Sequence, residues 1–119
     1  YVVDWLTRLE HSSEDEQFHL YVSAGNQLLV LTGVFAEYLQ ARTRRRGAPP
    51  PRYYEEVGRH SFRSAADHPR SKQAQLEQFY HRLAGQFGDL RQVLNDFSNR
   101  LVSFDALPPG LMEAKDGTA

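Results

Sequence analysis

The sequence contains no cysteine, so disulfide bonds, thiolate metal sites and a cysteine nucleophile are all excluded. It also lacks a long apolar run. The longest, Leu28 to Leu31, has four residues, against the roughly 20 that a membrane-spanning helix needs. No segment has the three-part layout of a signal peptide. We therefore expect a cytoplasmic protein that has no association with a membrane.

Strand patterns are missing too, because no stretch of useful length alternates apolar and polar residues. The 119 residues suit one domain, in which roughly two thirds of the unfolded surface can be buried. The chain begins with Tyr1 rather than methionine, so we expect a processed product or part of a longer protein. We predict an all-α bundle of five or six helices over residues 1–104. The segment 105–119, rich in proline and glycine, is expected to be a flexible C-terminal tail.

The net charge of −1 conceals an uneven distribution of charge along the chain. Residues 42–72 contain nine basic and three acidic residues, which gives +6, and the rest of the chain therefore carries −7. A basic middle with acidic flanks can pair within one molecule, pair between subunits or recruit a charged partner. Composition leaves these three possibilities open.

Helical spacing and capping residues divide the first half of the chain into segments. Residues 1–10 have the apolar spacing of a short helix. Ser13 stands three residues before Glu16, which is the capping box that starts a second helix. The apolar arc of that helix is wide, so it should lie near the centre of the bundle. Gly25 followed by Asn26 predicts a break or kink within it.

The segment "QARTRRRGAPPPRYY" has the composition of a helix end. Four arginines fall where cations favour the negative end of the helix dipole. Gly47 can adopt the left-handed cap conformation, and the prolines that follow cannot continue the helix. Pro51 suits the first turn of the next helix, which should end at His68 because Pro69 follows. The four arginines are Arg42, Arg44, Arg45 and Arg46.

Two more helices are predicted in the C-terminal half. Ser71 can cap the first of them, and Gly88 would end it. Asp89 can cap the last helix, which places its apolar residues on one face. These residues are Leu90, Val93, Leu94, Phe97, Leu101 and Phe104.

The segments "AGNQLLVLTGVFAEYLQAR" and "RYYEEVGRHSF" combine Gly-Asn, Gly-x-Phe and Tyr-Tyr-x3-Gly. In this pattern the chain resembles a family of uncharacterised bacterial all-helical proteins. The sequence departs from the family pattern at Asn26, in place of aspartate, and at Phe62, in place of tyrosine. The resemblance implies a bacterial origin and no activity, because it rests mostly on packing residues. The matching positions are Gly25, Gly33, Phe35, Tyr53, Tyr54, Gly58 and Phe62.

A metal site is the most specific enzymatic hypothesis. Glu16 and His19 lie three residues apart on one helical face, which is the spacing of dimetal sites in helical bundles. Such a site needs this motif twice and two further glutamates. The other Glu–His pairs are four residues apart, so the ligand set falls short and we expect no cofactor. Those pairs are Glu56 with His60 and Glu77 with His81.

The basic 42–72 region supports two binding hypotheses. Nucleic acid would bind its arginines and stack on Tyr53, Tyr54 and Phe62. The sequence pI of about 6.6 and the lack of a helix-turn-helix signature count against nucleic acid as the partner. A small ligand would instead occupy a cleft between helices. Its candidate lining residues are Tyr54, Gly58, His60 and Arg63.

No glycine-flanked serine elbow or phosphate-binding glycine loop is present, so nucleophilic catalysis has no support. We expect a non-catalytic interaction or regulatory module that forms a homodimer or binds an unknown protein partner. The acidic segment 10–16 and the basic segment 42–52 would meet between subunits, and raising the salt concentration should weaken such a dimer. The basic side of this contact would be Arg42, Arg44, Arg45, Arg46 and Arg52.

Overall fold

The computed structural model describes the backbone of residues 2–105 and the side chains of residues 2–101. Every regular element in this part of the chain is an α-helix, which confirms the predicted all-α class. Seven helices are present here, more than the five or six expected. Most of the predicted tail, residues 106–119, lies outside the described residues. The helices are α1 Val2–Glu10, α2 Glu14–Val34, α3 Ala36–Arg46, α4 Pro51–Asp67, α5 Pro69–Gln73, α6 Glu77–Gly85 and α7 Phe87–Asp105.

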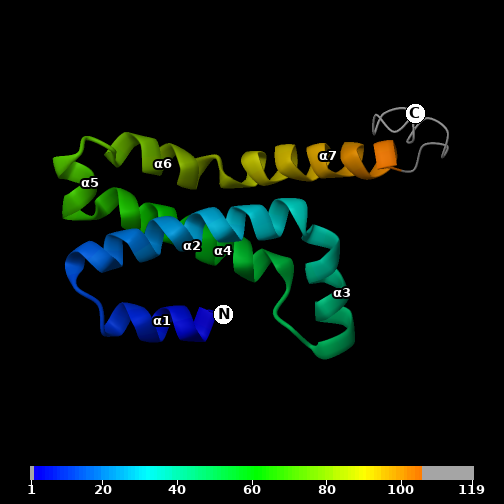
Figure 1. Cartoon of the computed structure of the whole chain (residues 1–119), viewed down its shortest axis with the longest axis horizontal. Helices are drawn as coiled ribbons and strands as arrows, with labels where there is room; N and C mark the ends of the chain where they lie inside the picture. The colour runs from blue at the N-terminus through cyan, green and yellow to red at the C-terminus, as the bar shows by residue number, and fades with distance from the viewer. Residues whose placement is uncertain (1, 106–119) are drawn as a thin grey trace, which may run out of the picture.

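Helices α2, α4, α6 and α7 form two layers, with α2 and α4 in one and α6 and α7 in the other (Figure 1). Helices α2 and α4 pack against each other, α6 packs along α4, and α7 packs along α2. Helices α6 and α7 follow one another almost in a line, so together they cover the length of the α2–α4 pair. Helix α1 lies along the other side of that pair, and α3 crosses the end of the molecule where α2 stops.

Several helix ends form where the sequence predicts them. The Ser13 hydroxyl accepts a hydrogen bond from the backbone N–H of Glu16 at 3.3 Å and caps α2. Gly47 caps α3 with φ = 66°, a left-handed conformation that glycine adopts without strain. Pro51 is the first residue of α4, and His68 ends that helix with φ = −71° and ψ = 143°. These ends depend on neighbouring residues alone, which is why the sequence indicates them.

The predicted break at Gly25 and Asn26 is wrong, because α2 runs without interruption from Glu14 to Val34. Gly25 serves close packing instead. A methyl group at this position would lie 2.6–2.8 Å from three atoms of the Phe62 ring. The chain changes direction later, at Phe35, whose φ of −107° and ψ of 30° separate α2 from α3.

The predicted helix ends in the C-terminal half are also displaced. Ser71 does not cap a helix but lies inside the short helix α5, which is capped by the His68 side chain. The His68 Nδ1 atom accepts a hydrogen bond from the backbone N–H of Arg70 at 3.1 Å. Gly88 and Asp89 both lie in the first turn of α7, so neither one separates two helices.

The core is centred on Phe62 and Phe87, which are fully buried together with Leu28. The two phenylalanine rings lie 6.0 Å apart between centroids. Gly58 lets α4 approach this cluster, since a methyl group there would lie 2.5 Å from the end of the Phe87 ring. The core therefore joins α2, α4 and the start of α7 through close contacts at glycine.

Candidate functional site

The predicted small-ligand residues are divided between two faces of α4. Gly58 is buried under Phe87, and Tyr54 packs against the core cluster. His60 and Arg63 instead line a groove of about 410 Å³ between α1 and α4. The two halves of the predicted site therefore do not face a common cleft. Apolar side chains of both helices share the groove with His60 and Arg63, namely Val2, Trp5, Leu6, Tyr53 and Val57.

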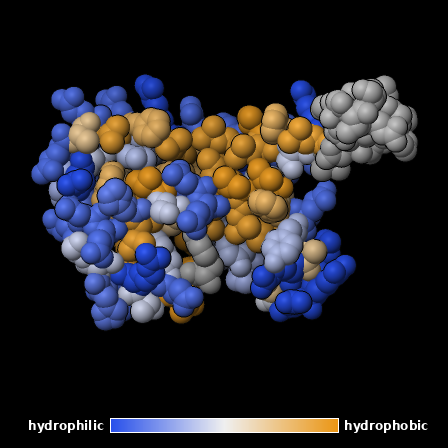
Figure 2. All heavy atoms as spheres, in the orientation of Figure 1, coloured by the Kyte–Doolittle hydropathy of each residue, from blue (hydrophilic) through white to orange (hydrophobic). Residues whose placement is uncertain are grey.

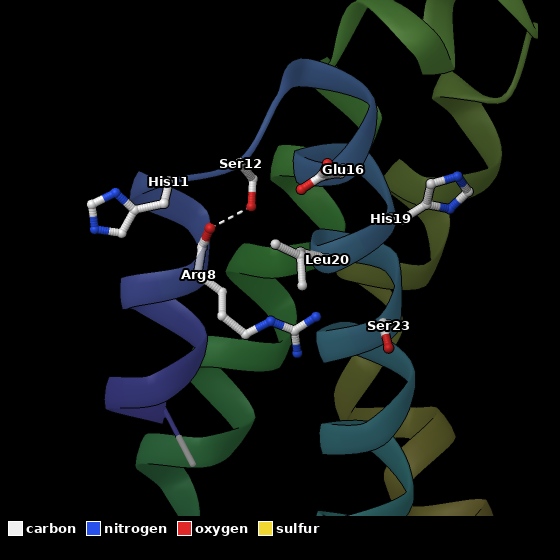
Figure 3. Close-up of a pocket in the computed structure, with 7 residues that line it drawn as sticks. All are labelled: Arg8, His11, Ser12, Glu16, His19, Leu20 and Ser23. Atoms are coloured by element: carbon white, nitrogen blue, oxygen red, sulfur yellow. Dashed lines mark hydrogen bonds between the residues drawn. The ribbon is translucent and has the colours of Figure 1, made fainter.

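Glu16 and His19 both line a depression of about 550 Å³ between α1 and α2 (Figure 3). The Glu16 carboxylate points toward α1, whereas the His19 imidazole points away from α1. The neighbouring Ser12 hydroxyl donates a hydrogen bond to the backbone carbonyl of Arg8. Within residues 2–101, no three histidine, aspartate or glutamate side chains come together in a group that could hold a metal ion. Glu16 and His19 therefore lie on one helix, but their side chains do not point toward a common position where a metal ion could bind both.

Part of the basic middle of the chain is neutralised within the molecule. Arg59 pairs with Glu56 at 2.8 Å and lies 3.6 Å from Glu55. Arg91 reaches Glu55 at 2.8 Å and so ties α7 to α4. Arg70 lies 3.4 Å from Asp15. Of these contacts, only the one between Arg70 and Asp15 offsets the +6 net charge of residues 42–72, because Glu55 and Glu56 are already counted in that net charge.

The arginines of α3 and the start of α4 are arranged differently. Among the described residues, the five arginines predicted as a charged patch have no carboxylate within ion-pair distance. Arg42 donates a hydrogen bond to the Tyr38 hydroxyl at 3.2 Å, and its guanidinium carbon lies 5.8 Å from the ring centre. This contact raises the pKa of Arg42 above its ordinary value. The five residues are Arg42, Arg44, Arg45, Arg46 and Arg52, and all are exposed.

The acidic segment 10–16 and the basic segment 42–52 lie near opposite ends of α2 (Figure 1). Helix α2 has 21 residues and is therefore about 32 Å long at about 1.5 Å per residue. Charges so far apart are screened from each other at physiological salt, where the Debye length is about 8 Å. Direct pairing of the two segments within one molecule is thus excluded.

The aromatic residues predicted to stack on bases are mostly part of the fold. Phe62 is fully buried, and Tyr54 packs against the core. Only Tyr53 is substantially exposed, at 41%. The nucleic-acid hypothesis in its sequence-based form therefore loses two of its three stacking residues.

An apolar surface on α7 is the feature that the sequence did not reveal. Val93, Phe97 and Leu101 are spaced four residues apart and form one stripe, which we call the α7 stripe. Their exposed fractions are 63%, 60% and 50%. Figure 2 shows apolar side chains gathered over α7 and the adjoining half of α2. The periodicity of α7 indicated an apolar face, but it could not indicate that this stripe stays uncovered.

No helix among the described residues is both long and apolar enough to cross a membrane. No protein-family model matches the chain, and comparisons with curated proteins and with solved structures found no significant similarity. The function must therefore be argued from the surfaces of the molecule.

Proposed function

We propose that this protein is a non-catalytic interaction module that self-associates through the α7 stripe. The main support is that Val93, Phe97 and Leu101 each expose half or more of their surface to solvent. Scattered apolar residues are normal on a protein surface, but a contiguous apolar area is characteristic of an interaction site. The continuity of this area over α7 and α2 supports an interface (Figure 2).

A second copy of the chain is the occupant that the geometry favours. Side chains at four-residue spacing form a nearly straight ridge on a helix, and a twofold axis across α7 pairs that ridge with itself. Each half-exposed side chain contributes about 1 kcal/mol when it is covered, so the six from two copies contribute about 6 kcal/mol. This gain is comparable with the roughly 4–15 kcal/mol cost of association. We therefore expect a weak, concentration-dependent dimer unless neighbouring apolar residues extend the contact.

Val30 is a further exposed apolar side chain, at 45%, on α2, the helix that packs against α7. Asn95 and Ser98 lie on another side of α7 and form hydrogen bonds with α2. The Asn95 amide donates to the Gly33 carbonyl at 3.1 Å, and the Ser98 hydroxyl donates to the Val34 carbonyl at 3.5 Å. These bonds hold α7 against α2, which leaves the stripe directed away from that contact.

The charged segments offer a second mode of association. One copy's acidic 10–16 segment can meet the basic 42–52 segment of another, because the two segments are too far apart to pair internally. The two modes differ in their response to salt. Ion pairs weaken as the salt concentration rises, whereas an apolar contact is maintained. Replacing Arg44 and Arg45 by glutamate would weaken the charge-paired mode and leave the apolar mode intact.

Sedimentation velocity over a range of protein concentrations tests the proposal. We expect the mass to rise from the 13.7 kDa monomer toward twice that value, and Phe97→Asp to abolish the rise. Asn99→Asp is the matched control, because it adds the same charge two residues away on a different face of α7. Far-ultraviolet circular dichroism would verify that both variants remain helical. A wild-type chain that stays monomeric at the highest soluble concentration would contradict self-association.

The α1–α4 groove supports one alternative function, the binding of a small organic ligand. Its apolar floor includes Trp5 and Val57, and His60 and Arg63 provide polar groups at its edge. Ligand sites commonly combine apolar walls with a few polar groups in this manner. Native mass spectrometry of the protein purified from cells would show extra mass if such a ligand is retained. Loss of that mass in an Arg63→Ala variant would locate the ligand in this groove.

A further inference from the structure

Helix α3 presents an exposed face that combines aromatic and arginine side chains. With about 3.6 residues per turn, four of its residues and its N-cap residue, Phe35, fall within an arc of roughly 100°. Phe35 and Tyr38 are 50% and 54% exposed. The remaining members are the exposed arginines 42, 45 and 46. We call this set, Phe35, Tyr38, Arg42, Arg45 and Arg46, the α3 face.

The α3 face is partly pre-organised. The bond from Arg42 to the Tyr38 hydroxyl and the contact of its guanidinium with the ring hold both side chains together. Tyr38, Arg42, Arg45 and Arg46 line a hollow of about 190 Å³. Figure 2 shows strongly hydrophilic side chains concentrated over α3 at one end of the molecule. No described carboxylate lies within ion-pair distance of these arginines, in contrast with Arg59 and Arg91.

We propose that the α3 face binds single-stranded nucleic acid, with its arginines on the phosphates and Phe35 and Tyr38 stacked on bases. Arginine side chains neutralise phosphates, and exposed aromatic rings stack on any unpaired base. The set differs from the one that the sequence indicated, because Tyr54 and Phe62 belong to the core, whereas Phe35 and Tyr38 are exposed on the same face as three arginines.

Three other anionic partners explain the face less completely. An acidic protein segment would pair with the arginines but would leave the two aromatic rings without a role. A membrane surface would require a broad apolar face, whereas Leu39, the large aliphatic residue of α3, is only 4% exposed. A duplex would conceal the faces of its bases and leave Tyr38 nothing to stack on. Single strands use both kinds of side chain.

Fluorescence anisotropy with a short labelled oligothymidylate or oligouridylate, using the full chain, tests this proposal. We expect a dissociation constant tighter than about 100 µM near physiological salt. The logarithm of the association constant should fall with the logarithm of salt concentration at a slope of about −2, as expected for three phosphate contacts. Absence of binding even at low salt would overturn the proposal.

Matched variants on the same helix make the test specific. Arg42→Gln combined with Arg45→Gln should weaken binding roughly tenfold, and Tyr38→Ala roughly fivefold. Tyr38→Phe keeps the stacking ring and loses only the hydrogen bond to Arg42, so it should weaken binding less than about twofold. Arg44→Gln is the control, because Arg44 lies about 120° around α3 from Tyr38 and outside the α3 face. This substitution should change affinity less than about twofold. If Arg44→Gln and Arg45→Gln, each as a single substitution, weakened oligonucleotide affinity equally, the proposal would be overturned. Wild-type affinity in Tyr38→Ala would overturn it as well, as would stronger binding to anionic lipid vesicles than to the oligonucleotides.

The proposal is independent of self-association through the α7 stripe, because it uses α3. It shares Arg42, Arg45 and Arg46 with the charge-paired mode of association. Sedimentation velocity on the same α3 variants should give the wild-type concentration dependence. A variant that loses both oligonucleotide binding and self-association would place the α3 face in the dimer contact and overturn its assignment to nucleic acid. Circular dichroism on each variant separates these results from a loss of folding.

Discussion

Replacing Gly58 by alanine places a methyl group where α4 contacts the fully buried ring of Phe87. The added carbon would lie 2.5 Å and 2.8 Å from two Phe87 ring atoms and 3.1 Å from the Leu28 Cβ atom. Both neighbours are completely buried, so neither can move aside without disturbing the rest of the core. We therefore expect Gly58→Ala to destabilise the fold, although alanine is the better helix former.

The size of the effect follows from two opposing contributions. Alanine in a helix interior is favoured over glycine by about 1 kcal/mol. Forcing an extra carbon into a well-packed core costs about 1–3 kcal/mol, and contacts below 3.0 Å with buried atoms belong at the upper end of this range. The net loss should be about 1–2 kcal/mol in the free energy of unfolding. For a domain of this size that corresponds to a fall in melting temperature of about 4–8 °C.

Thermal unfolding followed by circular dichroism measures this loss, with Gly85→Ala as the matched control. Gly85 is the last residue of α6, and a methyl group there would meet no atom within 4 Å. Gly85→Ala should therefore unfold at the wild-type temperature or slightly above it. Phe87→Leu should cost less in the Gly58→Ala background than in wild type, because it removes the ring atoms that clash. A Gly58→Ala protein as stable as Gly85→Ala would refute this account of the core.

Two further predictions concern aromatic residues. Trp5 donates a hydrogen bond to the Leu20 carbonyl at 3.1 Å and is the buried residue of α1, so Trp5→Phe should raise hydrogen exchange in α1 without altering exchange in α4. If hydrogen exchange in α1 were the same in Trp5→Phe as in wild type, this anchoring role would be contradicted. Burial raises the pKa of Tyr80 above its usual 10.0, so the unfolded chain loses this proton first and the folded state should lose stability as pH rises above about 10. Tyr80→Phe should flatten that alkaline loss in urea titrations; an unchanged slope would refute the link to Tyr80.

Local chemistry explains which parts of the fold the sequence predicts well. The cap at Ser13, the left-handed Gly47 and the helix start at Pro51 each depend on a few adjacent residues. The backbone conformation of such positions is restricted by their own side chains or by the lack of one. Their locations are therefore readable before any tertiary contact is known.

Gly25 shows where local reasoning fails. A glycine followed by an asparagine can end one helix and begin another, but the same glycine can also admit a ring from a distant segment. Here the ring is that of Phe62, 37 positions later in the chain, and α2 continues past Gly25 because the contact with α4 supports it. The same applies to the ligand hypothesis, in which Gly58 and His60 proved to lie on different faces of α4.

The apolar face of α7 separates what the sequence determines from what only tertiary packing determines. Helical periodicity alone places Val93, Leu94 and Phe97 on the same broad side, since residues three and four apart are neighbours on a helix. Packing then separates them: Leu94 rests against Gly33 of α2, while Val93 and Phe97 stay about 60% exposed. Periodicity specifies which side chains share a face, because it depends only on the helix itself. Whether that face is covered depends on where the other helices end, and only the folded chain determines that.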